Sequence, residues 1–600
     1  MPELKAYFSI GNTMSAQWSN DHSIVYISAD AKGTSLMQTD LCTGGDILLF
    51  QTKESIRGLH VALETGDIFF GLDDGGTENL QVYRLAKGAG APAPLTRRPE
   101  VMHLIGGLLA DNKTLAVSCN ARVRGTFDIM GIDIFTGESR MIVHNSDNYN
   151  MPAGLSPDRR FLMVNKLMGV SNNPLWMVDT QTGSVQKAPD LDVEAAYSSV
   201  AWKHDGSGFY MISDADADFA YVAYYDLASK TYQKRFAYDW DVSNLALSHD
   251  DRYLAICTNE GGYSDLKIYD LVNEAYLNTP KPPKGVISEY LPIFWAPGAA
   301  KLLFNVSGAA RPMDYWVLDI MSDSLEKVTH SDMAGLTADD FVQPRLCSFR
   351  SFDGLEIPYF LYAPKGMHEN MPVMLEIHGG PEGQSVPGIA YKELLHYMVS
   401  QGIAVAEPNV RGSTGYGKMY THLDDVEKRL DSVEDIACLI DHLVKTGVAD
   451  PQKIGVMGVS YGGFMTLSCA ARMPERLCCS VCTVGMFNLV TFLENTADYR
   501  RPHRESEYGT LANDRQTLCN VSPIAKVDDI TGPLMIIHGK NDPRVPVSEA
   551  YQAREYLHKR GVDIELLIYD DEGHGLHKLD NKLDCYPKVM RFVKKHMKID

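Results

Sequence analysis

The chain has 600 residues, 45% of them hydrophobic and 22% charged, which is typical of a globular protein too long for a single core. Its 56 Lys and Arg residues against 77 Asp and Glu residues give a net charge of −21. That balance argues against nucleic acid as a partner, because phosphate binding needs clustered cations. We therefore expect two or more domains and no nucleic-acid binding.

The sequence also gives no indication of a membrane or metal site. No run approaches the roughly 18 apolar residues of a membrane-spanning helix, and the first residues lack a basic-then-apolar signal pattern. The 11 cysteines are scattered through apolar segments, as expected of buried thiols in a reducing compartment. No Cys/His set has ligand spacing. We therefore expect a cytoplasmic protein with no membrane association, no metal and no cofactor, and leave homo-oligomer formation open.

The N-terminal half repeats one unit seven times. A Trp or Leu, a small polar turn and a β-rich run recur at intervals of 45 to 48 residues. Helical periodicity is almost absent from residue 14 to 325. Seven such units, each of four short strands, predict a seven-bladed β-propeller rather than an array of β-sandwiches. The second unit fits least well, because Arg84 stands where other units have Asp. The markers are Trp18, Leu63, Leu109, Leu155, Trp202, Leu247 and Trp295.

After a linker at 336–344, the pattern changes to strand then helix. The expected strands are near-continuous apolar runs, typical of buried parallel strands, and amphipathic helices such as 432–445 lie between them. This alternation predicts a doubly wound α/β sheet whose reactive groups lie at the carboxyl ends of its strands. We therefore expect a propeller domain at 1–335, with a short N-terminal extension, and an α/β domain at 336–600. The strands are 373–377, 403–406, 454–457, 480–484, 534–537 and 565–569.

One of these strands leads into a candidate nucleophile. The residues Gly458-Val459-Ser460-Tyr461-Gly462 fit the G-x-S-x-G elbow, in which a serine occupies a sharp turn between a strand and a helix. Glycines on both sides of Ser460 leave room for that turn. The helix expected at 464–472 would direct its N-terminal dipole at an oxyanion beside the serine.

Two further strands lead to a candidate acid and base. Asp542 follows the strand at 534–537, and the glycine-flanked His574 follows the strand at 565–569. Serine, acid and histidine in this order are typical of α/β-hydrolases. A neutral imidazole at His574 would take the serine proton, and Asp542 would orient the imidazole and stabilise the imidazolium. His577 competes for the role of base, whereas Asp570, Asp571 and Asp580 lie too near the histidine in sequence to be its partner.

A fourth stretch supplies a candidate oxyanion hole. His378-Gly379-Gly380-Pro381 directly follows the strand at 373–377, as the HGG-type loop does in α/β-hydrolases. We expect the backbone amides of Gly380 and Tyr461 to be the two donors. The alternative is a plain turn.

Taken together, these motifs resemble the prolyl oligopeptidase family of serine peptidases over essentially the whole chain. The motif set is 378–381, 409–417, 458–463, 538–546 and 572–575, and it looks most like the acylaminoacyl-peptidase and dipeptidyl-peptidase branches. In prolyl oligopeptidase and dipeptidyl peptidase IV a tyrosine hydroxyl serves the oxyanion hole, but this chain has His378 at that position. The resemblance to acylaminoacyl peptidases therefore implies the amide of Gly380. The propeller also lacks the adjacent glutamate pair with which dipeptidyl peptidases hold a free amine, since Glu194 and Glu260 stand alone.

The resemblance implies a peptidase for short or N-blocked peptides, with the propeller set over the active site. We expect it to exclude folded proteins and peptides longer than roughly 30 residues. Phe487 and Phe492, in the segment where the family places much of its side-chain pocket, would line an apolar pocket unless they belong to the core. Two alternatives remain: an amidase or esterase for a peptide-like small molecule such as an aminoacylated antibiotic, and a binding scaffold with an inactive hydrolase domain.

Overall fold

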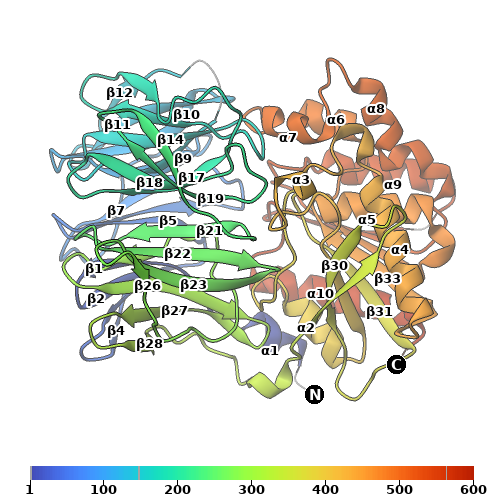
Figure 1. The fold of residues 1–600 in the computed structure, drawn as a ribbon. Coiled ribbons are helices and arrows are strands. Elements are labelled where there is room, and N and C mark those ends of the chain that lie inside the picture. Colours follow the sequence, from blue (N-terminus) through green and yellow to red (C-terminus); the bar gives the residue numbers. More distant parts are fainter. Residues whose placement is uncertain (1–2, 146–148, 563, 600) are drawn as a thin grey trace.

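The alternating apolar strands of the N-terminal half form seven four-stranded antiparallel sheets, drawn in blue to green in Figure 1. This computed structural model describes residues 3–145, 149–562 and 564–599. Each marker residue lies at or just after the end of its blade's first strand, apart from Trp18, which lies within β1. The predicted seven-bladed propeller is therefore confirmed.

Each blade takes its four strands from one continuous segment. The first four blades comprise β1 (Asn12–Asn20), β2 (Ser23–Asp30), β3 (Gly33–Asp40), β4 (Gly45–Thr52), β5 (Ser55–Ala62), β6 (Asp67–Asp73), β7 (Gln81–Leu85), β8 (Ala93–Pro94), β9 (His103–Leu108), β10 (Thr114–Val123), β11 (Thr126–Asp133), β12 (Ser139–Val143), β13 (Tyr149–Leu155), β14 (Phe161–Leu167), β15 (Leu175–Asp179) and β16 (Val185–Lys187). The last three comprise β17 (Tyr197–Trp202), β18 (Gly208–Ser213), β19 (Tyr221–Asp226), β20 (Thr231–Phe236), β21 (Val242–Leu247), β22 (Tyr253–Glu260), β23 (Tyr263–Asp270), β24 (Ala275–Tyr276), β25 (Phe294–Trp295), β26 (Lys301–Gly308), β27 (Arg311–Asp319) and β28 (Ser324–Lys327).

Side chains rather than a shared strand close the ring between the first and seventh blades. Trp18 and Tyr26 of the first blade pack against Leu303 and Tyr315 of the seventh in one buried cluster. The Trp18 indole N–H also donates to the carbonyl of Phe294, with an N–O distance of 3.0 Å. Burial of these large side chains therefore holds the two ends of the propeller together.

The C-terminal half forms one eight-stranded sheet in the order β29-β30-β32-β31-β33-β34-β35-β36. The first two strands pair antiparallel to their neighbours, and the others are parallel. All six predicted strands are present; β29 and β30 were not anticipated, because no helix separates them. The bounds are β29 (Arg345–Arg350), β30 (Glu356–Tyr362), β31 (Met371–Ile377), β32 (Ala404–Pro408), β33 (Ala449–Val459), β34 (Cys479–Thr483), β35 (Leu534–Gly539) and β36 (Ile564–Tyr569).

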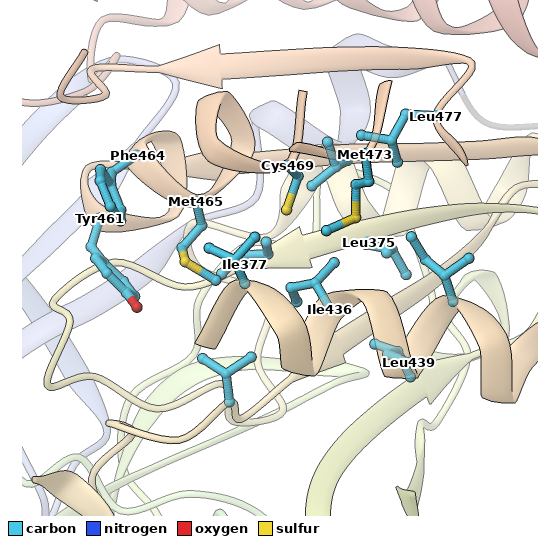
Figure 2. Packing of buried hydrophobic residues seen from close by; sticks show 14 of the residues in the cluster. Leu375, Ile377, Ile436, Leu439, Tyr461, Phe464, Met465, Cys469, Met473 and Leu477 are labelled. Carbon is cyan, nitrogen blue, oxygen red and sulfur yellow. The ribbon is translucent and has the colours of Figure 1, made fainter. Parts of the chain in front are cut away.

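Helices cover both faces of this sheet, since side chains alternate along each strand. Leu375 and Ile377 of β31 pack with Ile436 of α4 (Asp431–Lys445) and Phe464 of α5 (Tyr461–Arg472) (Figure 2). Met374, also on β31, faces the other way, toward α2 (Glu393–Ser400) and α10 (Leu579–Met597). The remaining helices of this half are α3 (Lys418–Thr421), α6 (Leu489–Asn495), α7 (Arg501–Tyr508), α8 (Arg515–Val521) and α9 (Ser548–His558). The doubly wound sheet is thus the predicted one.

The N-terminal helix α1 (Leu4–Phe8) packs on the α/β half rather than on the propeller. Phe8 stacks on Tyr586 of α10 with ring centroids 4.6 Å apart, and Tyr7 contacts Tyr397 of α2 edge-on at 5.7 Å. Between the halves, the last propeller strand ends at Lys327 and the first strand of the other sheet begins at Arg345. The proposed division at 335/336 falls in this interval and remains a prediction. In the described part of the chain, no helix is long and apolar enough to cross a membrane.

Candidate active site

Ser460 lies on a sharply bent turn between β33 and α5. Its backbone has φ 62° and ψ −116°, a conformation that a residue with a Cβ rarely adopts. The glycines make the turn sterically feasible. A Cβ on Gly458 would lie 2.4 Å from the carbonyl oxygen of Gly462, and a Cβ on Gly462 would lie 1.9 Å from that of Ile377. The local sequence therefore holds the serine at the carboxyl end of a central strand.

Asp542 and His574 are joined by a hydrogen bond of 2.7 Å between Nδ1 of the histidine and Oδ2 of the aspartate. The other carboxylate oxygen accepts the backbone N–H groups of Arg544 and Val545, at 2.8 and 3.0 Å. Burial by itself would raise the pKa of Asp542, but the charge of His574 and the hydrogen bond from it hold that pKa below its usual value. An ionised Asp542 accepts only, so Nδ1 of His574 carries a proton, and in the neutral form of the imidazole Nε2 is the unprotonated nitrogen.

The sheet brings the loops of all three residues to one edge. Ser460 follows β33, Asp542 follows β35 and His574 follows β36, and these strands belong to one parallel set. The carboxyl ends of parallel strands lie at the same edge, where α/β proteins place their ligands. Within the described residues the hydrogen bonds join His574 to Asp542 but do not join Ser460 to His574. Hydrogen bonds to a nucleophile are commonly long until substrate binds.

The His378–Pro381 loop lies against Ser460, the candidate nucleophile. A Cβ on Gly379 would lie 3.4 Å from the Cβ of Ser460. The carbonyls on both sides of the Gly380 amide are engaged: the Gly379 oxygen lies 2.9 Å from Nδ1 of His378, and the Gly380 oxygen accepts from Arg504 at 2.9 Å. The N–H groups of Gly380 and Tyr461 have no partner among the described residues, which leaves both free to donate.

A buried ionic network anchors the side chain of Tyr461. Its hydroxyl donates to Asp424 at 2.9 Å, and Nη1 of Arg429 lies 2.5 Å from the same carboxylate. Nη2 of Arg429 also pairs with Glu507 at 3.0 Å. Asp424, Asp425 and Glu507 form a group that could hold a metal ion, but two of these carboxylates already neutralise the buried Arg429. Sequence reasoning missed this network, whose members are separated in the chain and form no motif.

The predicted pocket residues need correction, because both are core residues. Phe487 is 0% exposed and packs among side chains from α5, β35 and α9. Phe492 is 2% exposed and meets Tyr508 edge-on at 6.0 Å. Neither ring has a face open to a substrate. The apolar character that suggested a pocket is explained by the burial of α6 and the segment before it.

A loop of the propeller touches the loops that carry Asp542 and His574. Nδ2 of Asn541 donates to the Gly75 carbonyl at 3.0 Å, and Glu78 pairs with Arg544 at 2.7 Å. A Cβ on Gly76 would lie only 2.5 Å from the backbone nitrogen of Gly573. These contacts join residues more than 450 positions apart, and no sequence signal beyond a glycine-rich turn pointed to them.

This geometry defines the α/β part as a hydrolase domain of the nucleophile-elbow type beside a propeller. Residues 390–600 match the prolyl oligopeptidase family. Dipeptidyl peptidase family member 6 of Caenorhabditis elegans is 32% identical over 240 residues, which are 39% of this chain and 32% of that protein. The acylamino-acid-releasing enzyme of Arabidopsis thaliana is 26% identical over 237 residues, 38% of this chain and 30% of that protein.

A solved puromycin hydrolase shares the fold over the whole length. The superposition covers 100% of this chain and 96% of that one, with a TM-score of 0.88 at 17% identity. The sequence matches, by contrast, span 32% and 30% of those two curated relatives. The similarity to the prolyl oligopeptidase family therefore rests on the C-terminal segment, whereas the superposition over the whole length shows a shared fold.

Proposed function

We propose that this protein is a serine peptidase that cleaves short or N-blocked peptides through an acyl-enzyme on Ser460. The observation that carries the proposal is the 2.7 Å hydrogen bond between His574 and Asp542, at the same sheet edge as a serine with a strained backbone. A base oriented by a buried carboxylate and a nucleophile held on a tight turn are the two parts that acyl transfer needs.

The chemistry follows from the free atoms of the site. Nε2 of His574 takes the proton of the Ser460 hydroxyl as the oxygen attacks the scissile carbonyl. The amide N–H groups of Gly380 and Tyr461 stabilise the resulting oxyanion, each by about 3 kcal/mol. His574 then gives its proton to the leaving amine, and water, activated by the same imidazole, releases the acyl group.

We infer the substrate class from the relatives that match the C-terminal segment and from the position of the propeller. The curated relatives that match the catalytic segment are named for the release of dipeptides or acylamino acids, which favours peptides over other small amides. Contacts from Gly75 and Glu78 place a propeller loop directly beside the acid and base loops. Entry of extended peptides only, below roughly 30 residues, is therefore part of the proposal.

Three assays test this function. A fluorophosphonate probe should label the wild type but not Ser460→Ala, and Ser460→Ala should lose several orders of magnitude in kcat while keeping its thermal unfolding midpoint. A panel of free and acetylated aminoacyl and dipeptidyl anilides shows whether the enzyme prefers a free or a blocked N-terminus, and one residue or two before the cleaved bond. A mixture of a ten-residue peptide and unfolded casein tests size selection. Wild-type activity in Ser460→Ala would refute the mechanism, and internal cleavage of casein would refute the size limit alone.

A further inference from the structure

Among the residues that the structure describes, the Arg500 side chain has no hydrogen-bond or ion-pair partner, although Arg501 and Arg504 next to it are paired. It lies near the His378–Pro381 loop, called the oxyanion loop below. Arg500 and Arg504 are one helical turn apart at the start of α7, and the Arg504 backbone N–H donates to the Arg500 carbonyl at 3.0 Å. Residues four apart share a helix face. Arg504 is buried, pairs with Glu382 and donates to the Gly380 carbonyl at 2.9 Å. This face of α7 therefore points toward the oxyanion loop.

The same region is bounded by the propeller. Tyr499, the residue before Arg500, meets Phe127 of the third blade edge-on at 5.4 Å. Arg544, two positions after the catalytic acid, is bound to Glu78 of the second blade. Figure 1 shows α7 where the propeller and the hydrolase domain face each other. Arg500 thus lies between the two domains and close to the candidate active site.

The charges here do not balance. Glu382 is bound by Arg504 and Glu78 by Arg544, but the Arg500 guanidinium makes no hydrogen bond or ion pair with any residue that the structure describes. Its Nε is buried without an acceptor. Burial and the charges of Arg544 and Arg504 lower the pKa of Arg500. Arg500 is only half-buried, so its terminal nitrogens remain accessible to an anion, and an anion there would offset the cost of the unpaired buried Nε.

We propose that Arg500 binds a carboxylate of the peptide substrate. The inference rests on the proposed peptidase function and deepens it. A peptide carries two kinds of carboxylate, the C-terminus and the side chains of Asp and Glu, and a guanidinium recognises both in the same bidentate way. The chain has a net charge of −21, which by itself would repel anionic peptides. A preference for peptides with a carboxylate would therefore point to a local positive site rather than to the overall charge.

The test compares Arg500→Gln with Arg501→Gln. Arg501 is the adjacent residue, lies 3.5 Å from Asp498 and serves as the matched control. The substrates are hexapeptides of one sequence with a free C-terminus or a C-terminal amide, each with Glu or Gln at one internal position. The wild type should prefer the carboxylate form by about 10- to 100-fold in kcat/KM. Arg500→Gln should remove that preference and leave the rate on the neutral peptide unchanged.

The outcomes separate three claims: the source of the carboxylate, the role of Arg500 and the peptidase function itself. A preference tied to the C-terminus or to the Glu position identifies the source of the carboxylate. An unchanged preference in Arg500→Gln, or an equal loss on charged and neutral peptides, overturns the inference. If the wild type cleaves no peptide, the proposed function fails. Calorimetric titration of the same peptides into Ser460→Ala, with and without Arg500→Gln, then decides the carboxylate site independently of cleavage.

Discussion

Replacing Gly76 in the propeller with alanine should lower the activity of the candidate site in the α/β domain. Gly76 has φ +74°, where an alanine costs roughly 1 kcal/mol. Its Cβ would lie 2.5 Å from the backbone nitrogen of Gly573, about 1 Å closer than an ordinary contact. Both sides of the contact are backbone, so one of the two loops must shift, and we expect the loop that carries His574 to move by a similar distance. Misplacement of a catalytic group by about 1 Å can reduce the rate on the order of 100-fold.

We therefore expect Gly76→Ala to lower kcat/KM by about 10- to 100-fold on a short peptide substrate. The assay is steady-state cleavage of that peptide, with the thermal unfolding midpoint measured in parallel. Gly88→Ala is the matched control, because Gly88 has φ +77° in the same blade and no atom within 4 Å of the added Cβ. If both variants keep the same kcat/KM, the propeller loop does not position the histidine, and the reasoning is refuted.

Three further outcomes are expected. His574→Ala should lose far more kcat than His577→Ala, and the reverse would mean that His577 is the base. Arg429→Met should lower the free energy of unfolding by about 3–5 kcal/mol, measured by urea denaturation, because it leaves buried carboxylates unpaired; an unchanged midpoint would contradict this. The pKa of His422, whose Nε2 lies 2.8 Å from the Ser171 hydroxyl, is raised above 6.5 by a hydrogen bond to a carboxylate. That stabilisation is complete below pH 6.5 and is lost as pH rises through the folded-state pKa. His422→Gln should therefore lower the thermal unfolding midpoint more at about pH 5.5 than at about pH 8.5. An equal effect at both pH values would refute this prediction.

Features that depend on short stretches of chain could be predicted from the sequence. The regular interval between Trp18 and the later markers was enough to predict a seven-bladed propeller, because each blade is one continuous segment. The glycines around Ser460 were enough to predict the sharp turn at this serine, because their steric role is local. The order of Ser460, Asp542 and His574 indicated one sheet edge, since parallel strands align their carboxyl ends.

Only the tertiary structure decided which apolar side chains are core and which charges are paired. Phe487 is apolar and lies in the segment where a pocket was expected. Its burial depends on helices whose positions no local pattern specifies. The contact of Gly76 with Gly573 and the pairing of Glu78 with Arg544 depend on how two separately folded domains meet. That Arg500 has no partner among the described residues can be seen only once the neighbouring carboxylates are placed. Packing and electrostatic pairing are set by distances in space, which sequence separation does not determine.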